Sequence, residues 1–196
     1  PDELIKTLVD KLHSEGKYSV GYAGGISVSN AMDDFIQAMV KLKEKDNVAA
    51  IIIGEGILKD ELQNIKSDQH LDNVHFVGSI AKDKVNPTLG LLDALYIGSK
   101  KSKLYEYGVS ANKIFDYLNV GLPIVNAFDT MHSPMNYLGN TIECIAEDPI
   151  SIADGILKST ELTKEERERI KCESSKFVVE NHNYDDLAKR FSGLFR

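Results

Sequence analysis

Residues 108–125 read GVSANKIFDYLNVGLPIV, and they contain one helix-and-strand unit of the predicted fold. A flexible Gly-Val-Ser-Ala-Asn segment leads into a short helix that we expect over 112–119. Gly121 ends this helix, and the β-rich Pro-Ile-Val run after it predicts a strand over 123–126. The stretch is therefore typical of an α/β protein.

The start of this helix carries groups that suit an anion. A loop that enters a helix presents unpaired backbone N–H groups and the positive end of the helix dipole, which attract phosphate. Lys113 adds a positive charge, and Asp116 shares a helix face with it because it lies three residues further on. The stretch predicts a seat for a nucleotide diphosphate, with Asp116 accepting hydrogen bonds from sugar hydroxyls. An ordinary capped helix in a β-α-β unit is the alternative.

Helical and strand-like segments alternate over the whole chain. The apolar run 48–53 is bounded by Asn47 and Gly54, as expected of a parallel strand buried on both faces. The alternation predicts a doubly wound, mainly parallel, six-stranded Rossmann-like sheet in one domain, residues 1–196. We expect strands at 18–23, 48–53, 74–77, 94–98, 123–126 and 142–146, and helices at 2–15, 32–42, 58–66, 82–93, 112–119, 133–138, 149–159, 163–180 and 184–194. Ser29 or Asn30 is the expected N-cap of the second helix.

Ligands of such a fold bind beyond the carboxyl ends of the strands. The loops expected there are 24–30, 54–58, 78–84, 99–111 and 126–134. Two of them carry glycine where the backbone must approach another group closely, namely Gly24-Gly25 and the Gly54-Glu55-Gly56 turn. Neither is a GxGxxG dinucleotide fingerprint, and a tight strand-to-helix turn is the alternative for each.

Composition limits the class of protein. The 196 residues carry a net charge of −7, which argues against a nucleic-acid-binding surface. No apolar run reaches the roughly 18 residues of a membrane span, and no signal peptide is evident. Cys144 and Cys172 form no metal or disulfide motif, so we expect a reducing, cytoplasmic environment. The chain begins at Pro1, and we expect it to be a piece of a longer protein.

Familiar catalytic motifs are missing from the sequence. It contains no GxSxG, no HExxH and no P-loop, and we expect no metal site. Among the five histidines, His132 is the one expected at the ligand edge of the sheet. Lys100, Lys101 and Lys103 form a local basic excess, although each of them alone fits an ordinary surface lysine. The sequence thus offers binding groups more plainly than catalytic ones.

Five segments carry a family resemblance: GYAGG (21–25), IIIGEGILKDEL (51–62), NVHFVGSI (73–80), SANKIFDYLNVGLPIV (110–125) and ENHNYDDLAKRF (180–191). Together they resemble the C-terminal, donor-binding domain of GT-B glycosyltransferases of the family-4 type. Bacterial enzymes of surface-polysaccharide assembly are especially similar, because their SPNKLFDYMAAGKPIV-like segment matches 110–125 almost position for position. The segments stand in the expected order and span nearly the whole chain.

The resemblance implies a nucleotide-sugar site between two Rossmann-like halves, of which this chain is the half that holds the nucleotide. Asp116 matches the second acidic residue of the family's Glu-x7-Glu motif, which holds the ribose hydroxyls. The backbone around Ser79 and Ile80 would contact the base. The further donor-binding candidates are Lys113 and the amides near Ser110 and Asn112 at the diphosphate, with Gly24, Gly25, Gly54 and Gly56 along the loops.

Two departures from the family pattern stand out. Gly108 occupies the position of the first acidic residue, and the nearest carboxylate, Glu106, becomes the one catalytic candidate. Family members also carry an Arg/Lys pair around the first βα loop, whereas GGISVSN (24–30) has no basic residue. Lys113, with Lys100 or Lys101, would then supply the positive charge.

The expected function is the donor half of a retaining, hexosyl-type glycosyltransferase in bacterial surface polysaccharide or lipopolysaccharide assembly. The family habit implies a UDP-sugar donor and no cofactor. The expected partners are a missing N-terminal acceptor-binding domain and a glycan or lipid-linked acceptor, at the inner face of the membrane in the full-length protein; the isolated domain would be inactive. A nucleotide-sugar epimerase of the same fold and a non-catalytic nucleotide-binding module stay open as alternatives.

Overall fold

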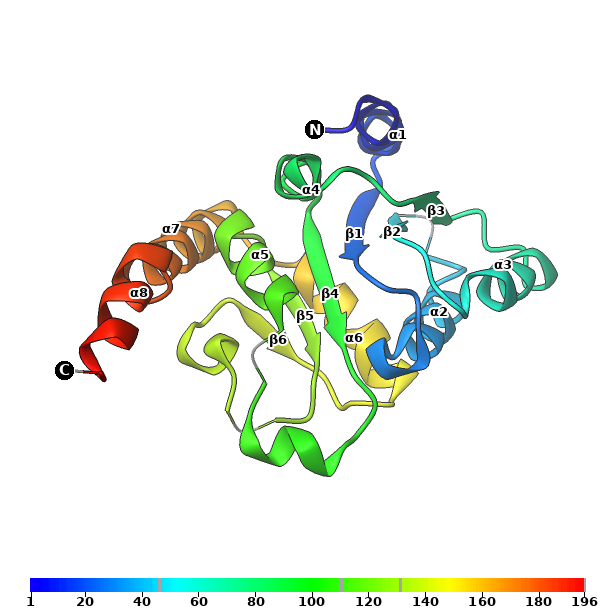
Figure 1. Ribbon diagram of the computed structural model, residues 1–196. Helices are drawn as coiled ribbons and strands as arrows, with labels where there is room; N and C mark the ends of the chain where they lie inside the picture. The colour runs from blue at the N-terminus through cyan, green and yellow to red at the C-terminus, as the bar shows by residue number, and fades with distance from the viewer. Residues whose placement is uncertain (46, 110, 131, 196) are drawn as a thin grey trace.

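Six parallel strands form one central sheet (Figure 1). The computed structural model describes residues 1–45, 47–109, 111–130 and 132–195. The strands lie in the order β3-β2-β1-β4-β5-β6, which confirms the doubly wound α/β fold predicted from the sequence. Their bounds are Tyr18–Ala23 (β1), Val48–Ile53 (β2), Val74–Gly78 (β3), Ala94–Gly98 (β4), Ile124–Ala127 (β5) and Thr141–Glu143 (β6).

The four inner strands β2, β1, β4 and β5 are buried on both faces, whereas the edge strands β3 and β6 are mostly half-buried. All six residues of β2 are buried. Successive side chains of a strand point to opposite faces, so Ile51 packs into one hydrophobic cluster and Ile52 into the other. The sheet therefore separates two cores, each closed by a layer of helices.

Helices cover both faces of the sheet (Figure 1). One face packs against α2 (Met32–Lys41), α3 (Lys59–Asp68) and α6 (Pro149–Thr160). The other packs against α1 (Glu3–Ser14), α4 (Lys82–Leu89), α5 (Asn112–Val120) and α7 (Lys164–Asn181). Short 3₁₀ turns occur at η1 (Val28–Asn30), η2 (Lys103–Tyr107) and η3 (Pro134–Tyr137).

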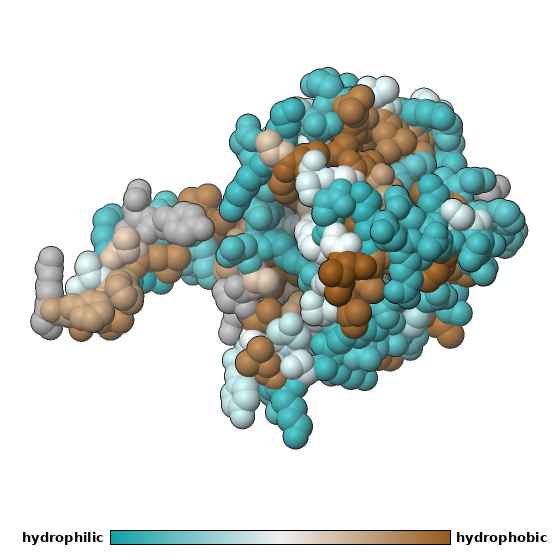
Figure 2. All heavy atoms as spheres, turned by 45° about the vertical axis from the view of Figure 1, so that its right-hand side comes forward, coloured by the Kyte–Doolittle hydropathy of each residue, from teal (hydrophilic) through white to brown (hydrophobic). Residues whose placement is uncertain are grey.

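The last helix, α8 (Tyr184–Gly193), extends away from the sheet (Figure 1). Figure 2 shows it as the end of an arm that carries apolar surface beyond the compact body. Phe191 is 63% exposed, Leu194 78% and Phe195 76%. The helix predicted over 184–194 is thus present and ends at Gly193, and the exposed apolar side chains at this end of the chain add little to either core.

Several sequence expectations about the elements are wrong. The strand expected over 142–146 is Thr141–Glu143, and the helix expected over 133–138 is the 3₁₀ turn η3. Neither Ser29 nor Asn30 caps α2, since its N-cap is Ala31, in the left-handed region at φ 50°. The helix expected over 82–93 ends at Leu89, because the chain turns there and enters β4 beside β1. Asp93 N–H donates to the Ser19 carbonyl at 3.0 Å, and the Asp93 carboxylate accepts from Ser19 N–H at 2.8 Å.

Candidate functional site

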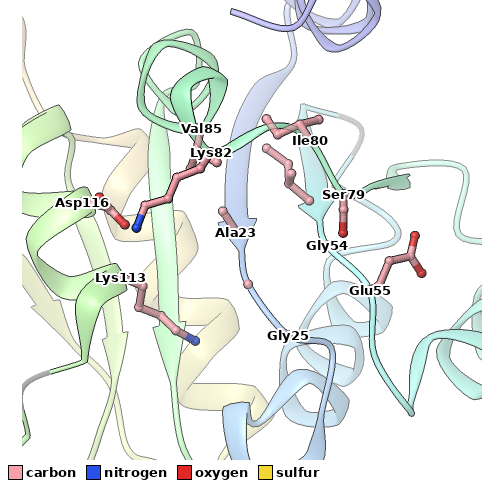
Figure 3. A pocket seen from close by; sticks show the side chains of 12 residues that line it. Ala23, Gly25, Gly54, Glu55, Ser79, Ile80, Lys82, Val85, Lys113 and Asp116 are labelled. Atoms are coloured by element: carbon pink, nitrogen blue, oxygen red, sulfur yellow. The ribbon is translucent and has the colours of Figure 1, made fainter.

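A pocket of about 390 Å³ lies beyond the carboxyl ends of β1, β2 and β3, where α5 approaches from the β4 side (Figure 3). This is the switch point of the sheet, because the chain runs from β1 towards β3 and then returns to β4. The pocket is lined by Ala23, Gly24, Gly25, Ile53, Gly54, Glu55, Ser79, Ile80, Lys82, Val85, Lys113 and Asp116.

One side of the pocket is built mainly from backbone, and we call it the backbone wall: Gly24, Gly25, Gly54, Ser79 and Ile80. The loops that form it are joined by hydrogen bonds from Gly24 N–H to the Ile53 carbonyl and from Gly54 N–H to the Gly78 carbonyl, both 2.9 Å. Gly54 has a φ of +147°, and a Cβ there would overlap the Gly24 carbonyl oxygen. Only glycine fits at this crossing.

Gly56 supports the same wall from behind and does not line the pocket. A Cβ on Gly56 would overlap the backbone of Ile26. Ile26 also donates from its N–H to the Glu55 carbonyl at 2.9 Å, so a backbone hydrogen bond joins the loop after β1 to the loop after β2. The Glu55 side chain, which we did not single out from the sequence, reaches the pocket and pairs with Lys59 at 2.7 Å.

The opposite side consists of charged side chains, and we call it the charged wall: Lys82 from α4, and Lys113 and Asp116 from α5. Helix α5 is fixed against β1 by Tyr117, whose buried hydroxyl accepts a 2.9 Å hydrogen bond from Ala23 N–H. Its N-cap, Ala111, offers no side-chain cap. The helix start at Asn112 therefore keeps backbone N–H groups that no capping side chain satisfies.

Lys113 has an unusual environment for a lysine. Its ammonium donates to Asn30 Oδ1 at 2.7 Å and to the Tyr22 hydroxyl at 3.1 Å. It also lies 4.8 Å from the centre of the Tyr22 ring. Burial lowers the pKa of Lys113 to about 8 and raises that of Tyr22 well above its ordinary value. The described residues form no ion pair with this ammonium, which makes it a fitting partner for an anion.

Lys82 is the charged residue that the sequence reasoning missed. Figure 3 shows its side chain running along the pocket with the amine directed towards Asp116. The signal for it in the sequence is its position in the loop 78–84, which is expected beyond the carboxyl end of a strand. The pocket thus contains two lysines and one aspartate on the same wall.

The other candidates lie elsewhere. Glu106 lines a second pocket of about 300 Å³ together with Lys101, Ser102, Lys103, Asp129 and Thr130. Lys100 forms ion pairs with Asp33 at 2.8 Å and Asp34 at 2.6 Å, so its charge is already balanced. His132 lines a further pocket, against Phe177 and His182. Asn112 begins α5 but does not line the main pocket, and Ser110 lies outside the described residues.

In the described part of the chain, no group of three or more His, Cys, Asp or Glu side chains is arranged to hold a metal ion. Likewise, none of the helices in this part combines the length and the apolar character that crossing a membrane requires.

The fold is similar to those of solved glycosyltransferase structures. S. aureus TarM, in a complex with fondaparinux, alpha-GlcNAc-glycerol and UDP, has a TM-score of 0.76 and 18% identity, over 92% of this chain and 36% of that one. Anabaena HepE, in a complex with UDP and glucose, has a TM-score of 0.72 and 19% identity, and the match covers 98% of this chain and 52% of the HepE chain. The C-terminal domain of the group 1 glycosyl transferase LpcC of Francisella tularensis has a TM-score of 0.65 and 21% identity, and the match covers 89% of this chain and 92% of the LpcC domain.

Sequence comparison defines the family. Among curated proteins, none matches the chain. The sequence model of the family described as "Glycosyl transferases group 1" matches residues 17–161, which is most of the chain. The match includes every residue that lines the main pocket. This chain belongs to the group 1 glycosyl transferases.

Proposed function

We propose that this chain is the donor-binding half of a retaining glycosyltransferase, and that its main pocket holds a nucleotide sugar. The observation that carries the proposal is the half-buried Lys113 ammonium, which faces the pocket without a carboxylate partner among the described residues. It stands beside the uncapped start of α5. An anionic group on a ligand would supply the negative charge that the Lys113 ammonium lacks as a partner.

The two walls suggest how a nucleoside diphosphate would lie. Its diphosphate would meet Lys113 and the α5 start, its ribose hydroxyls would donate to Asp116, and its base would rest against the backbone at Ser79 and Ile80. When the sugar departs, negative charge accumulates on the diphosphate, and a fixed cation there stabilises that charge. The chain would then contribute leaving-group stabilisation, with no metal.

Several parts of the activity lie beyond this chain. It spans 36% of the TarM chain and 52% of the HepE chain. We therefore assign the acceptor site and any general base to a further, N-terminal domain, with a glycan or lipid-linked acceptor at the cytoplasmic face of the membrane. UDP is the favoured nucleotide because TarM and HepE were both solved with UDP.

The alternative functions receive less support. An epimerase of this fold would need a histidine and catalytic carboxylates around the donor sugar, and none of the described residues lining the main pocket is a histidine. A non-catalytic nucleotide-binding module would use the same pocket, so the presence of the pocket cannot distinguish it from a transferase. Only sugar transfer by the longer protein makes that distinction.

Calorimetric titration of the chain with UDP, GDP and uridine tests the proposal. We expect UDP to bind more tightly than uridine, and Lys113→Ala to weaken UDP binding by about 1.5–3 kcal/mol, the size of a hydrogen bond to a charged group. Asp116→Ala should weaken UDP and uridine alike, because both carry the ribose. Circular dichroism of each variant checks that it is folded.

Two outcomes would contradict the proposed donor site. A folded wild-type chain that binds neither UDP nor GDP would refute an independent donor site. Binding of uridine as tight as that of UDP would show that the pocket does not recognise the diphosphate.

A further inference from the structure

The Lys113 ammonium is held by two neutral oxygen atoms, one from β1 and one from the first βα loop. Tyr22 belongs to β1, and Asn30 ends η1 in the first βα loop. The sequence GGISVSN of that loop has no basic residue. The positive charge near the loop thus comes from α5, while the loop region contributes acceptors.

These two acceptors are themselves fixed by one carbonyl. The Tyr22 hydroxyl donates to the Gly25 carbonyl at 2.8 Å, and Asn30 Nδ2 donates to the same oxygen at 2.9 Å. Asn30 Nδ2 also donates to Ser27 Oγ at 3.0 Å. Because each side chain donates to the loop and accepts from Lys113, the position of the ammonium is coupled to the conformation of the loop at Gly25.

The neutrality of the acceptors matters. An ammonium has three N–H groups, and Tyr22 and Asn30 account for two of them. A carboxylate at either position would fix the amine equally well but would also neutralise it. Neutral acceptors restrain the amine while its charge stays available to a ligand.

We propose that Tyr22 and Asn30 are positioning residues, which hold the Lys113 ammonium where the diphosphate of the donor binds. This inference rests on the proposed function. It assigns to the first βα loop a role other than direct cationic contact with phosphate, and it makes the preference for a diphosphate over an uncharged nucleoside depend on the placement of one amine.

The test measures UDP and uridine affinities by calorimetry on the 196-residue chain and on four single variants. Asn30→Ala should reduce UDP affinity about five- to tenfold, and Tyr22→Phe, which keeps the ring, about threefold, because each removes one hydrogen bond from a charged group. Asn30→Asp should reduce UDP affinity more than Asn30→Ala, since its carboxylate neutralises the amine. Uridine affinity should stay unchanged in all three. Val28→Ala, an exposed change in the same loop that removes no hydrogen bond, should match the wild type.

A double variant separates positioning from a structural role. In a Lys113→Ala background, Asn30→Ala should cause no further loss of UDP affinity, because there is no amine left to position. An equal loss in both backgrounds would overturn the inference, as would an Asn30→Asp variant that binds UDP like the wild type. Wild-type protein that fails to bind UDP would instead refute the donor site itself.

Discussion

The two walls of the pocket differ in what determines them. The backbone wall follows from strand ends and tight loops, whose atoms are fixed by hydrogen bonds between neighbouring loops. The charged wall depends on the conformations of the charged side chains of α4 and α5. The first wall is therefore part of the fold, whereas the second can change without affecting the sheet. The shape of the pocket should be sensitive to substitutions in the backbone wall, and its recognition of charge to substitutions in the charged wall.

Gly54→Ala should have the largest effect, because the backbone wall leaves no room for a Cβ. It would force a non-glycine residue to φ +147° and against the Gly24 carbonyl. We expect a loss of about 2–4 kcal/mol in the free energy of unfolding, measured by urea denaturation. Gly139→Ala is the matched control, since nothing lies within 4 Å of its Cβ position. If the two variants were equally stable, the backbone wall would tolerate a Cβ at position 54 and would not be fixed by close backbone contact.

Tyr117→Phe tests the link between the walls. It removes the acceptor of the Ala23 N–H and leaves a partly buried donor unsatisfied. We expect a loss of about 1–3 kcal/mol in the free energy of unfolding. Tyr107→Phe serves as the control, because Tyr107 is 86% exposed. A Tyr117 variant as stable as that control would mean that α5 holds its place without this hydrogen bond.

The charge of Lys113 should make UDP binding depend on pH. Its pKa is lowered from 10.5 to about 8, so the ammonium loses its proton above that value. We expect the affinity ratio of UDP to uridine to fall about tenfold from pH 7 to pH 9. The same group should affect stability in the opposite direction: its burial as a cation lowers the free energy of unfolding below about pH 8, and this cost is relieved as the pH rises towards 10.5.

Calorimetric titrations over this pH range check the binding part of the prediction. Lys113→Met provides the control, because it has no proton to lose and its UDP-to-uridine ratio should stay flat. A wild-type ratio that does not change from pH 7 to pH 9 would contradict the assignment of Lys113 to the diphosphate.

Lys82→Ala should have the smallest effect of the four. Lys82 is exposed, and its amine points towards Asp116 (Figure 3). We expect UDP binding to weaken by about 0.2–1 kcal/mol, and the difference to shrink in high salt. Lys84→Ala is the control on the same helix, since Lys84 pairs with Asp2 at 3.7 Å, away from the pocket. A loss as large as that of Lys113→Ala would show that Lys82 is a main phosphate contact.

The sequence predicted the backbone wall better than the charged wall. Strand ends follow from apolar runs such as 48–53, and once the strands are ordered, their loops must meet. Lys113 and Asp116 were found because they share one face of a single helix. The family resemblance was confirmed by the match over residues 17–161. The roles of the site residues, Lys113 and Asp116 included, stay predictions until a ligand is bound.

What the sequence could not reveal were partners distant along the chain. Asn30 was expected to cap α2, but its side chain bonds to Gly25 and Lys113 instead. Lys100 was considered for phosphate, but it is paired with two aspartates of α2. Such choices depend on which groups the fold brings within reach, and local patterns do not contain that information.

The strand order also has a consequence for biosynthesis. β1 lies in the middle of the sheet, between β2 and β4. As the chain leaves the ribosome, β2 follows soon, but β4 comes only after β3 and α4 have been made. Until then, one edge of β1 lacks its neighbour, and unpaired strand edges invite association with other chains. The nascent protein therefore exposes an unpaired edge of β1 until residues 94–98 emerge, and a molecular chaperone would be useful in that interval.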